Sequence, residues 1–258
     1  MSYYRPKTVM ITGSTGDFGR AFAQRFAEIG SKLILHGRSK DKLDALAEEI
    51  KSGFNADVEI CVCDVADADA IAGAIEGVSE DFRDIDLLIN NAGLALGQSG
   101  ATDAELSDWL TMIDVNNRGL VAFTHEVLKI MNARGKGHII NIGSTAGSYP
   151  YPGGHVYCAS KAFVKQFSLS LRADLLDKNI RVTNIEPGMV ETQFSTVRFK
   201  GDESAAANVY ANTDPLTAED VAESVFWAAT LPEHFNINRI EMMPTRQAPG
   251  PLAVDRDK

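Results

Sequence analysis

The chain has 258 residues, a length that fits one α/β domain better than two. Its 35 Asp and Glu residues outnumber its 25 Lys and Arg residues, and the net charge of −10 argues against a nucleic-acid-binding surface, because affinity for nucleic-acid phosphates comes mainly from Lys and Arg. The sequence has no metal-ligand cluster and no apolar run long enough to cross a membrane, so we expect a protein that binds neither metal ions nor membranes. The first expected strand begins at residue 7 and leaves no room for a signal peptide, so we expect a cytoplasmic protein.

Short β-rich apolar runs alternate with amphipathic runs along the chain. Strands are expected near 7–12, 32–36, 58–63, 86–90, 137–142, 181–186 and 238–243, and helices over 18–29, 40–51, 67–78, 105–132, 156–177 and 217–230. This alternation predicts a Rossmann-type, doubly wound parallel sheet of about seven strands, with helices on both faces and a ligand crevice at the carboxyl ends of the strands. We expect a single domain over 1–258, in which the least regular stretches form a lid over the crevice (193–213) and a C-terminal tail (246–258).

A glycine-rich turn follows the first expected strand at once and leads into an amphipathic run at near-helical spacing. Strand, glycine-rich turn and helix are the context that a dinucleotide-binding fingerprint requires. Glycines allow a tight turn and close approach of the backbone to a pyrophosphate, which sits at the helix N-terminus. We therefore predict a dinucleotide site that includes Gly13, Ser14, Thr15, Gly16, Asp17, Phe18 and Gly19.

Tyr157 and Lys161 are four residues apart in a helical run, and Ser144 precedes Tyr157 by thirteen residues. A helix brings residues i and i+4 onto one face, about 5–6 Å apart at Cβ. An ammonium beside a phenol favours the phenolate and lowers a tyrosine pKa from about 10, which suits a general acid or base near neutral pH. The Tyr/Lys pair alone is also common in surface packing, so the proton-transfer hypothesis depends on the glycine-rich turn in the same chain.

Further motifs follow the turn in a fixed order. They are Asn90-Asn91-Ala92-Gly93, Asn116, the set Ser144, Tyr157 and Lys161, and Pro187-Gly188 after the sixth expected strand. Together with Thr12 to Gly19, they make the whole chain resemble the short-chain dehydrogenase/reductase family. One position departs from the family pattern: Asp17 stands where the family has its second glycine, and a carboxylate there repels a pyrophosphate unless it points outward.

The resemblance implies roles for the site residues. Tyr157 exchanges a proton with the substrate oxygen while hydride moves to or from a nicotinamide, Lys161 lowers the Tyr157 pKa and holds the nicotinamide ribose, and Ser144 orients the substrate oxygen. Asn116 supports a water that links Lys161 to solvent. Other cofactor contacts are implied for Asp64, Val65, Asn91, Ala92, Gly93, Pro187, Gly188, Val190 and Thr192. Members of the family usually form tetramers, so a homotetramer is expected.

The end of the second expected strand favours NADP(H) as the cofactor. An NAD site usually places Asp or Glu about twenty residues after the glycine turn, where it binds the ribose 2′-hydroxyl. Gly37 occupies this place, Arg38 and Ser39 follow, and the first acid is Asp41. A guanidinium suits a 2′-phosphate in charge and fork geometry, so we predict that Arg38 and Ser39 contact it. The alternative is that Arg38 is an ordinary exposed loop residue.

Longer segments indicate a substrate class. The stretches 90–97, 137–147 and 197–202 resemble the bacterial NADP-dependent 3-hydroxy acid dehydrogenases, which oxidise serine and allo-threonine and reduce semialdehydes. The segment from 236 onward also resembles the sulfoacetaldehyde reductases. Both classes act on small anions, so cationic or amide donors are expected near the mouth of the crevice; the candidates are Arg198, Arg246 and Gln247, with Lys200 next.

The leading hypothesis is therefore an NADP-dependent enzyme that moves hydride between the cofactor and a small acidic alcohol or aldehyde, of the 3-hydroxy acid dehydrogenase type. Two alternatives stay open. One is a sulfoacetaldehyde reductase that forms isethionate. The other is a non-catalytic NADP-sensing regulator on the same fold, which the presence of both Tyr157 and Lys161 disfavours.

Overall fold

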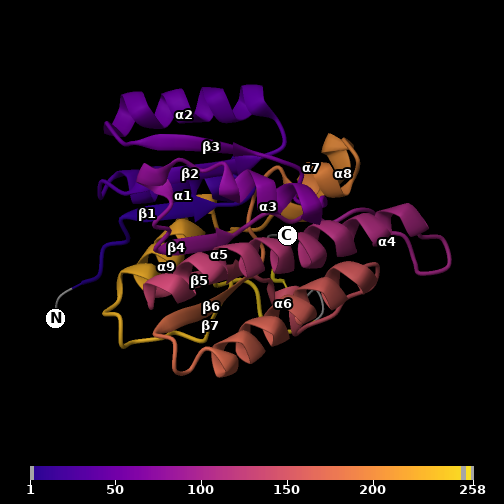
Figure 1. Ribbon diagram of the computed structural model, residues 1–258. Helices are drawn as coiled ribbons and strands as arrows, with labels where there is room; N and C mark the ends of the chain where they lie inside the picture. The colour runs from indigo at the N-terminus through magenta and orange to yellow at the C-terminus, as the bar shows by residue number, and fades with distance from the viewer. Residues whose placement is uncertain (1–2, 251–253, 257–258) are drawn as a thin grey trace.

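A computed structural model describes residues 3–250 and 254–256. In this part of the chain, seven parallel strands form one sheet (Figure 1). They are β1 (Thr8–Ile11), β2 (Lys32–Gly37), β3 (Val58–Val62), β4 (Leu87–Asn90), β5 (Gly137–Ile142), β6 (Ile180–Pro187) and β7 (Arg239–Met242), and they lie in the order β3-β2-β1-β4-β5-β6-β7. The predicted doubly wound parallel sheet is confirmed.

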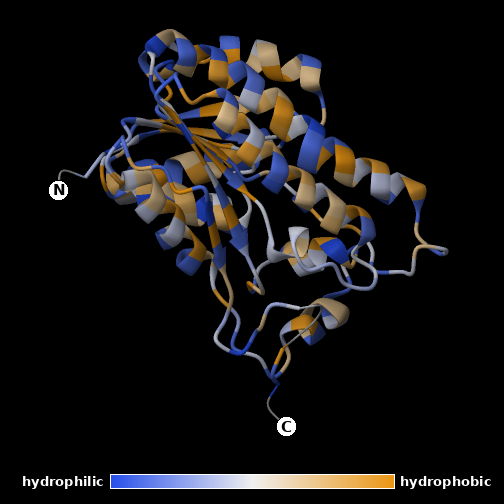
Figure 2. Ribbon diagram, turned by 90° about the horizontal axis from the view of Figure 1, so that it is seen from below, coloured by the Kyte–Doolittle hydropathy of each residue, from blue (hydrophilic) through white to orange (hydrophobic). Residues whose placement is uncertain are grey.

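Helices cover both faces of the sheet. One face packs against α1 (Asp17–Ala27), α2 (Lys40–Phe54) and α9 (Ala218–Thr230), and the other against α3 (Ala68–Glu76), α5 (Leu120–Arg134) and α6 (His155–Asp174). Successive residues of a strand point to opposite faces. Val9 and Ile11 accordingly join the first apolar cluster, whereas Met10 joins the second, and all three are fully buried. This burial on both faces explains why the strands read as continuous apolar runs, which Figure 2 shows in orange.

The strand order reverses between β1 and β4, because β2 and β3 lie on one side of this pair and β5 to β7 on the other. A crevice forms at the carboxyl ends of strands at such a switch point. Gly13 follows β1 and Asn91 follows β4, so the glycine-rich turn and the Asn-Asn-Ala-Gly motif meet there.

Two expected elements differ from the structure. The helix expected over 105–132 is divided into α4 (Leu106–Ile113), a π-helix (Asp114–Gly119) and α5. The 193–213 segment is more regular than expected, since it contains α7 (Phe194–Arg198) and α8 (Glu203–Tyr210), which lie beyond one end of the sheet (Figure 1). Of the expected tail, residues 251–253 and 257–258 lie outside the described residues. Among the described helices, none combines the length and the apolar character needed to cross a membrane.

Candidate active site

The glycine-rich turn is held against the end of β4 by a small hydrogen-bond network. The Thr12 hydroxyl accepts from the backbone N–H groups of Asn91 and Ala92, both at 3.0 Å, and the Asn91 side chain donates to the carbonyls of Thr12 and Gly13 at 2.9 and 3.1 Å. Gly13 has φ +65°, and a Cβ there would lie 2.9 Å from the Ala92 Cα. These hydrogen bonds therefore hold the two motifs together, and Gly13 allows their close approach because it has no side chain.

Helix α1 begins directly after this turn. Gly16 is its N-cap and Asp17 its first residue. A Cβ on Gly19 would lie 2.4 Å from the Gly13 carbonyl oxygen, so Gly19 allows α1 to pack closely against the turn. The first N–H groups of a helix have no partners within the helix and favour an anionic ligand. The Asp17 carboxylate turns instead toward Gln193, whose backbone N–H donates to Oδ2 at 2.6 Å.

Helix α6 places Tyr157 and Lys161 side by side, as their spacing predicts. The Lys161 ammonium donates to the Ile142 carbonyl at 2.9 Å, and its Nζ lies 5.9 Å from the centre of the Tyr157 ring. Ser144 follows β5 and approaches Tyr157 from the sheet side. A Cβ on Gly147 would lie 2.8 Å from the Lys161 carbonyl, so this glycine lets the turn after Ser144 pack directly on the helix backbone.

Burial controls the protonation of this pair. Burial raises the pKa of Tyr157 above its usual value, and a hydrogen bond with Ser144 partly opposes this change. Burial also lowers the pKa of Lys161 to about 8. The structure does not have the expected lowering of the Tyr157 pKa by Lys161, because burial of the phenol raises this pKa and the Lys161 ammonium donates to the Ile142 carbonyl. The phenol consequently holds its proton at neutral pH and is suited to donate it to a substrate oxygen.

Asn116 lies in the π-helix between α4 and α5 and is 1% exposed. Its side-chain oxygen accepts from the Leu94 N–H at 2.8 Å, and its amide nitrogen donates to the Leu94 carbonyl at 2.8 Å and to the Ser160 hydroxyl at 3.0 Å. Asn116 thus links the loop after β4 to α6. The wider π turn directs this side chain inward, a feature that is frequent at functional sites.

Two cavities share the wall that carries Ser144 and Tyr157. The first, here called the main cavity, is lined by Gly13, Gly16, Asp17, Phe18, Asn91, Ala92, Gly93, Leu94, Ile142, Gly143, Ser144, Tyr157, Lys161, Pro187, Gly188, Val190, Thr192, Gln193, Phe194 and Val197. The second, the adjoining cavity, includes Ser144, Thr145, Tyr149, Tyr151, Tyr157, Gly188, Met189, Phe194, Arg198, Met243 and Gln247. The main cavity therefore brings together residues of the glycine-rich turn, the Asn-Asn-Ala-Gly motif, the Ser144, Tyr157 and Lys161 set and Pro187-Gly188, whereas Asn116 lies outside both linings.

The predicted anion-binding residues are not equally placed. Arg198 lines the adjoining cavity, where its Nη1 donates to the Tyr151 hydroxyl at 2.8 Å and its Nε to the Gly97 carbonyl at 3.3 Å. Gln247 lines the same cavity and accepts from the Met189 N–H at 2.8 Å. Arg246 lies outside both cavity linings and forms an ion pair with Asp255 at 3.4 Å.

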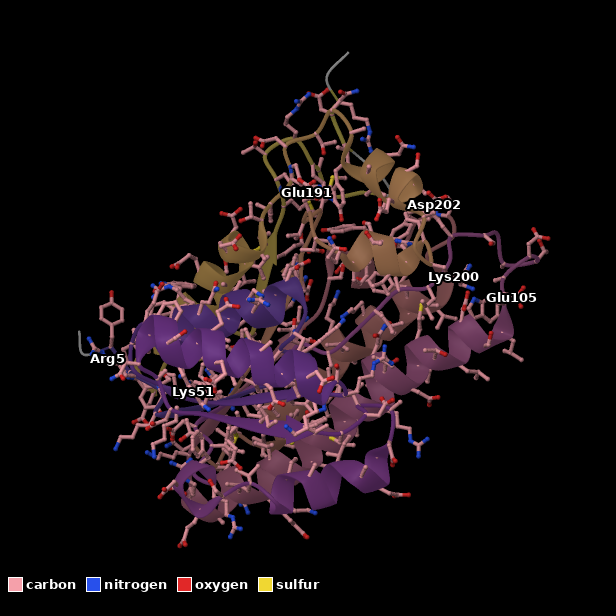
Figure 3. All side chains as sticks on the ribbon, turned by 90° about the horizontal axis from the view of Figure 1, so that it is seen from above. Arg5, Lys51, Glu105, Glu191, Lys200 and Asp202 are labelled. Carbon is pink, nitrogen blue, oxygen red and sulfur yellow. The ribbon has the colours of Figure 1, made fainter. Side chains whose placement is uncertain are left out.

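Lys200, the next candidate, also lies outside both cavity linings. Its ammonium pairs with Asp108 at 2.8 Å, and it lies beside the start of α4, near the labelled Glu105 in Figure 3. Of the four candidate donors, Arg198 and Gln247 are therefore the two that share a cavity with Tyr157.

Some predicted cofactor residues lie outside the main-cavity lining. Ser14 is fully buried, and its hydroxyl donates to the Ile11 carbonyl and accepts from the His36 N–H, so it joins β1 to β2. Arg38 is exposed directly after β2, and Ser39 is the N-cap of α2. The remaining residues of this group lie around the same end of the sheet and are Thr15, Gly19, Asp64 and Val65. Their contacts with a cofactor stay predictions.

Sequence reasoning missed three residues of the site. Tyr151 contacts Arg198, Phe194 packs its ring 5.6 Å from that of Tyr157, and Gln193 contacts Asp17. The two tyrosines shortly before α6, Tyr149 and Tyr151, were a signal for the first. The other two contacts depend on how the 193–213 segment folds over the sheet, which no local pattern specifies.

Comparisons with known proteins agree with this geometry. Residues 7–203 match the family model for short chain dehydrogenases. The chain is 52% identical over 250 residues to sulfoacetaldehyde reductase 2 of Chromohalobacter salexigens, which covers 96% of this chain and 98% of that protein. It is 53% identical over 249 residues to the NADP-dependent 3-hydroxy acid dehydrogenase YdfG of Salmonella typhi, with 96% and 99% covered.

Among solved structures, the closed form of serine dehydrogenase complexed with NADP+ is 50% identical, covers 97% of this chain and 100% of that chain, and superposes with a TM-score of 0.90. Levodione reductase is 26% identical, with a TM-score of 0.84 and coverage of 92% and 96%. The motifs, the fold and the site geometry agree with these matches, and the chain belongs to the short-chain dehydrogenase family.

Proposed function

We propose that this protein is an NADP(H)-dependent oxidoreductase that moves hydride between the cofactor and a small acidic alcohol or aldehyde. The observation that carries the proposal is the shared wall of the two cavities. Ser144 and Tyr157 face a glycine-lined cavity on one side and, on the other, a cavity that contains the Arg198 guanidinium. A dinucleotide in the first and an anionic substrate in the second meet at the phenol.

The main cavity fits a dinucleotide. Gly13 and Gly93 keep its floor clear, because a Cβ on Gly93 would lie 3.4 Å from the Lys161 ammonium and 3.3 Å from the Asn116 oxygen. The N-terminus of α1 faces this cavity through Gly16 and Asp17 and suits a pyrophosphate. Arg38 is exposed after β2, where Gly37 replaces the acid that an NAD site needs, and this supports NADP(H). A relative described as NADP-dependent and a serine dehydrogenase structure complexed with NADP+ support the same choice.

In this proposal the residues act as follows. NADPH, when bound, supplies the hydride. Tyr157 donates its proton to the substrate carbonyl oxygen and, in the oxidative direction, accepts the alcohol proton. Ser144 donates a hydrogen bond to the same oxygen and sets its position. Lys161 holds the ribose and stabilises the phenolate after proton transfer, and Asn116 keeps α6 and the loop at Leu94 in register.

The adjoining cavity supports a small anionic substrate. Arg198 supplies a fixed positive charge in a protein whose net charge of −10 otherwise repels anions. Gln247, which also lines this cavity, adds amide donors. Carboxylates of 3-hydroxy acids and semialdehydes and the sulfonate of sulfoacetaldehyde have the same charge, and relatives of similar identity act on either class. We propose the carboxylates as the principal substrates and sulfoacetaldehyde as the alternative.

We further infer one domain over 1–258 with a lid at 193–213 and a tail at 246–258, assembled as a homotetramer in the cytoplasm. An apolar stripe on α4 supports self-assembly. Leu106, Leu110 and Ile113 are 64%, 51% and 44% exposed and lie on one side of this helix, and Phe163 on α6 is 44% exposed. Their spacing is typical of a helix that packs against another helix.

A substrate panel tests the proposal. The pure protein is mixed with NADPH or NADH and with malonic semialdehyde, sulfoacetaldehyde or propanal, an uncharged aldehyde of similar size. We expect NADPH oxidation with the two anions and far slower oxidation with propanal. A protein that binds NADPH but oxidises it with no aldehyde would be a cofactor sensor, and a preference for NADH would contradict the cofactor assignment.

A further inference from the structure

Asp17 connects the two walls of the main cavity. It lines this cavity from the glycine-rich turn, and Gln193 lines it from the other side. The Gln193 N–H donates to the Asp17 Oδ2 at 2.6 Å, at a point where both residues reach solvent. This hydrogen bond therefore spans the mouth of the cavity rather than its floor.

The backbone at this position makes no demand for glycine. Asp17 is the first residue of α1 and, within the described chain, does not appear among the non-glycine residues with positive φ. The glycines that the turn needs are present at Gly13, with φ +65°, and at Gly19, where a Cβ would lie 2.4 Å from a carbonyl oxygen. Position 17 is free to carry a side chain, and the side chain it carries is an acceptor aimed at the facing wall.

The facing wall leads directly to the catalytic tyrosine. Gln193 precedes α7, whose first residue, Phe194, packs its ring 5.6 Å from the Tyr157 ring. The other end of α7 is also fastened, since the Gly97 N–H donates to the Arg198 carbonyl at 2.9 Å and Lys200 pairs with Asp108 at 2.8 Å. Asp17 thus holds the chain just before the start of α7, whereas Gly97 and Asp108 hold it at and after the end of this helix.

The charge of Asp17 has a second consequence. A pyrophosphate at the N-terminus of α1 brings negative charge toward this carboxylate, and like charges repel. An Asn side chain has the same shape and an oxygen that can accept from the Gln193 N–H, but no charge. The hydrogen bond and the charge are therefore separable by substitution.

We propose that Asp17 is a positioning residue that holds the entrance of the 193–213 segment against the glycine-rich turn, and that its charge lowers the affinity of the protein for a dinucleotide. The second half rests on the proposed function, whereas the contact with Gln193 does not. The first effect positions Phe194 against the Tyr157 ring, and the second governs cofactor exchange.

The test compares Asp17→Asn and Asp17→Ala in the full-length protein, with Glu76→Gln as the matched control. Glu76 is the last residue of α3 and is exposed, and its replacement by Gln also removes one negative charge. Without cofactor, hydrogen exchange of residues 193–201 and tryptic cleavage after Arg198 and Lys200 report on the segment. Equilibrium titration gives the Kd for NADPH, and steady-state kinetics give kcat separately from KM.

We expect Asp17→Asn to leave exchange and cleavage unchanged and to lower the Kd for NADPH about tenfold, because one negative charge near the pyrophosphate is removed. Asp17→Ala should speed exchange and cleavage several-fold and lower kcat. Its Kd for NADPH should exceed that of Asp17→Asn by at most about tenfold. Glu76→Gln should change none of these. Unchanged exchange and cleavage in Asp17→Ala would overturn the positioning role, and an unchanged Kd in Asp17→Asn would overturn the role of the charge. Wild-type protein that fails to bind NADPH would refute the proposed function instead, and the exchange result would still stand.

Discussion

Arg198 provides the sharpest test of how the substrate is held. Its guanidinium lies in the same cavity as Tyr157 and is fixed by the Tyr151 hydroxyl at 2.8 Å and the Gly97 carbonyl at 3.3 Å. Under the proposed function, the acid group of the substrate binds this guanidinium while the substrate carbonyl lies at Tyr157. Arg198→Ala removes the charge, and Arg198→Lys keeps a charge but cannot make both fixing contacts.

The magnitude follows from the kind of contact that is lost. A hydrogen bond to a charged group contributes about 1.5–3 kcal/mol, which corresponds to about 10- to 150-fold in kcat/KM. Arg198 is half-buried, so screening by solvent reduces this figure less than for an exposed ion pair. Loss of its contacts with Tyr151 and Gly97 affects acidic and neutral substrates alike and cancels in their ratio.

The assay is therefore the ratio of kcat/KM for malonic semialdehyde to that for propanal, measured with saturating NADPH. Arg198→Ala should lower this ratio about 10- to 150-fold, and Arg198→Lys should lower it less. Arg246→Ala serves as the matched control, since Arg246 is bound to Asp255 outside both cavity linings. If the ratio in Arg198→Ala equals that of wild type, the anion is held elsewhere, with Gln247 as the next candidate.

Two further changes test the cofactor site and the core. Arg38→Ala should raise the KM for NADPH about 10- to 150-fold more than the KM for NADH, because NADPH alone carries the 2′-phosphate; equal changes for both cofactors would make Arg38 an ordinary surface residue. Burial lowers the pKa of His138 well below its usual value of 6.5, so its contribution to stability is complete above pH 6.5 and is lost as pH falls, when the unfolded chain takes up a proton that the folded protein excludes. The free energy of unfolding should therefore fall by about 1 kcal/mol from this residue between pH 6.5 and 5.5, and His138→Asn, but not the same change at exposed His125, should flatten the pH dependence; an equal slope in all three proteins would refute this reasoning.

Local sequence patterns predicted the parts of the site that depend on single elements. The strand, turn and helix around Gly13 and the i, i+4 spacing of Tyr157 and Lys161 are properties of short segments, and the structure has both arrangements. Parallel strands then place their carboxyl ends at one edge, so Asn91 and Ser144 come near without further information.

Features that depend on contacts between distant segments could not be predicted. Asn116 in the π-helix contacts Leu94 and Ser160, and the pattern of residues 105–132 predicts a continuous helix with no π turn. The direction of the Tyr157 pKa depends on how much of the phenol is buried, which the Tyr/Lys spacing does not reveal. The contact of Asp17 with Gln193 joins residues 176 positions apart, and it exists because α7 folds across the end of the sheet.

The central claim is that Tyr157 is the acid and base of a hydride-transfer enzyme, and one measurement tests it most directly. Tyr157→Phe removes the hydroxyl and little volume, and the buried ring can keep its contact with Phe194. Turnover of the best substrate with NADPH should fall about 10²–10⁴-fold, while the Kd for NADPH measured by titration stays within a few-fold of wild type. Turnover near the wild-type value in this variant would contradict the account.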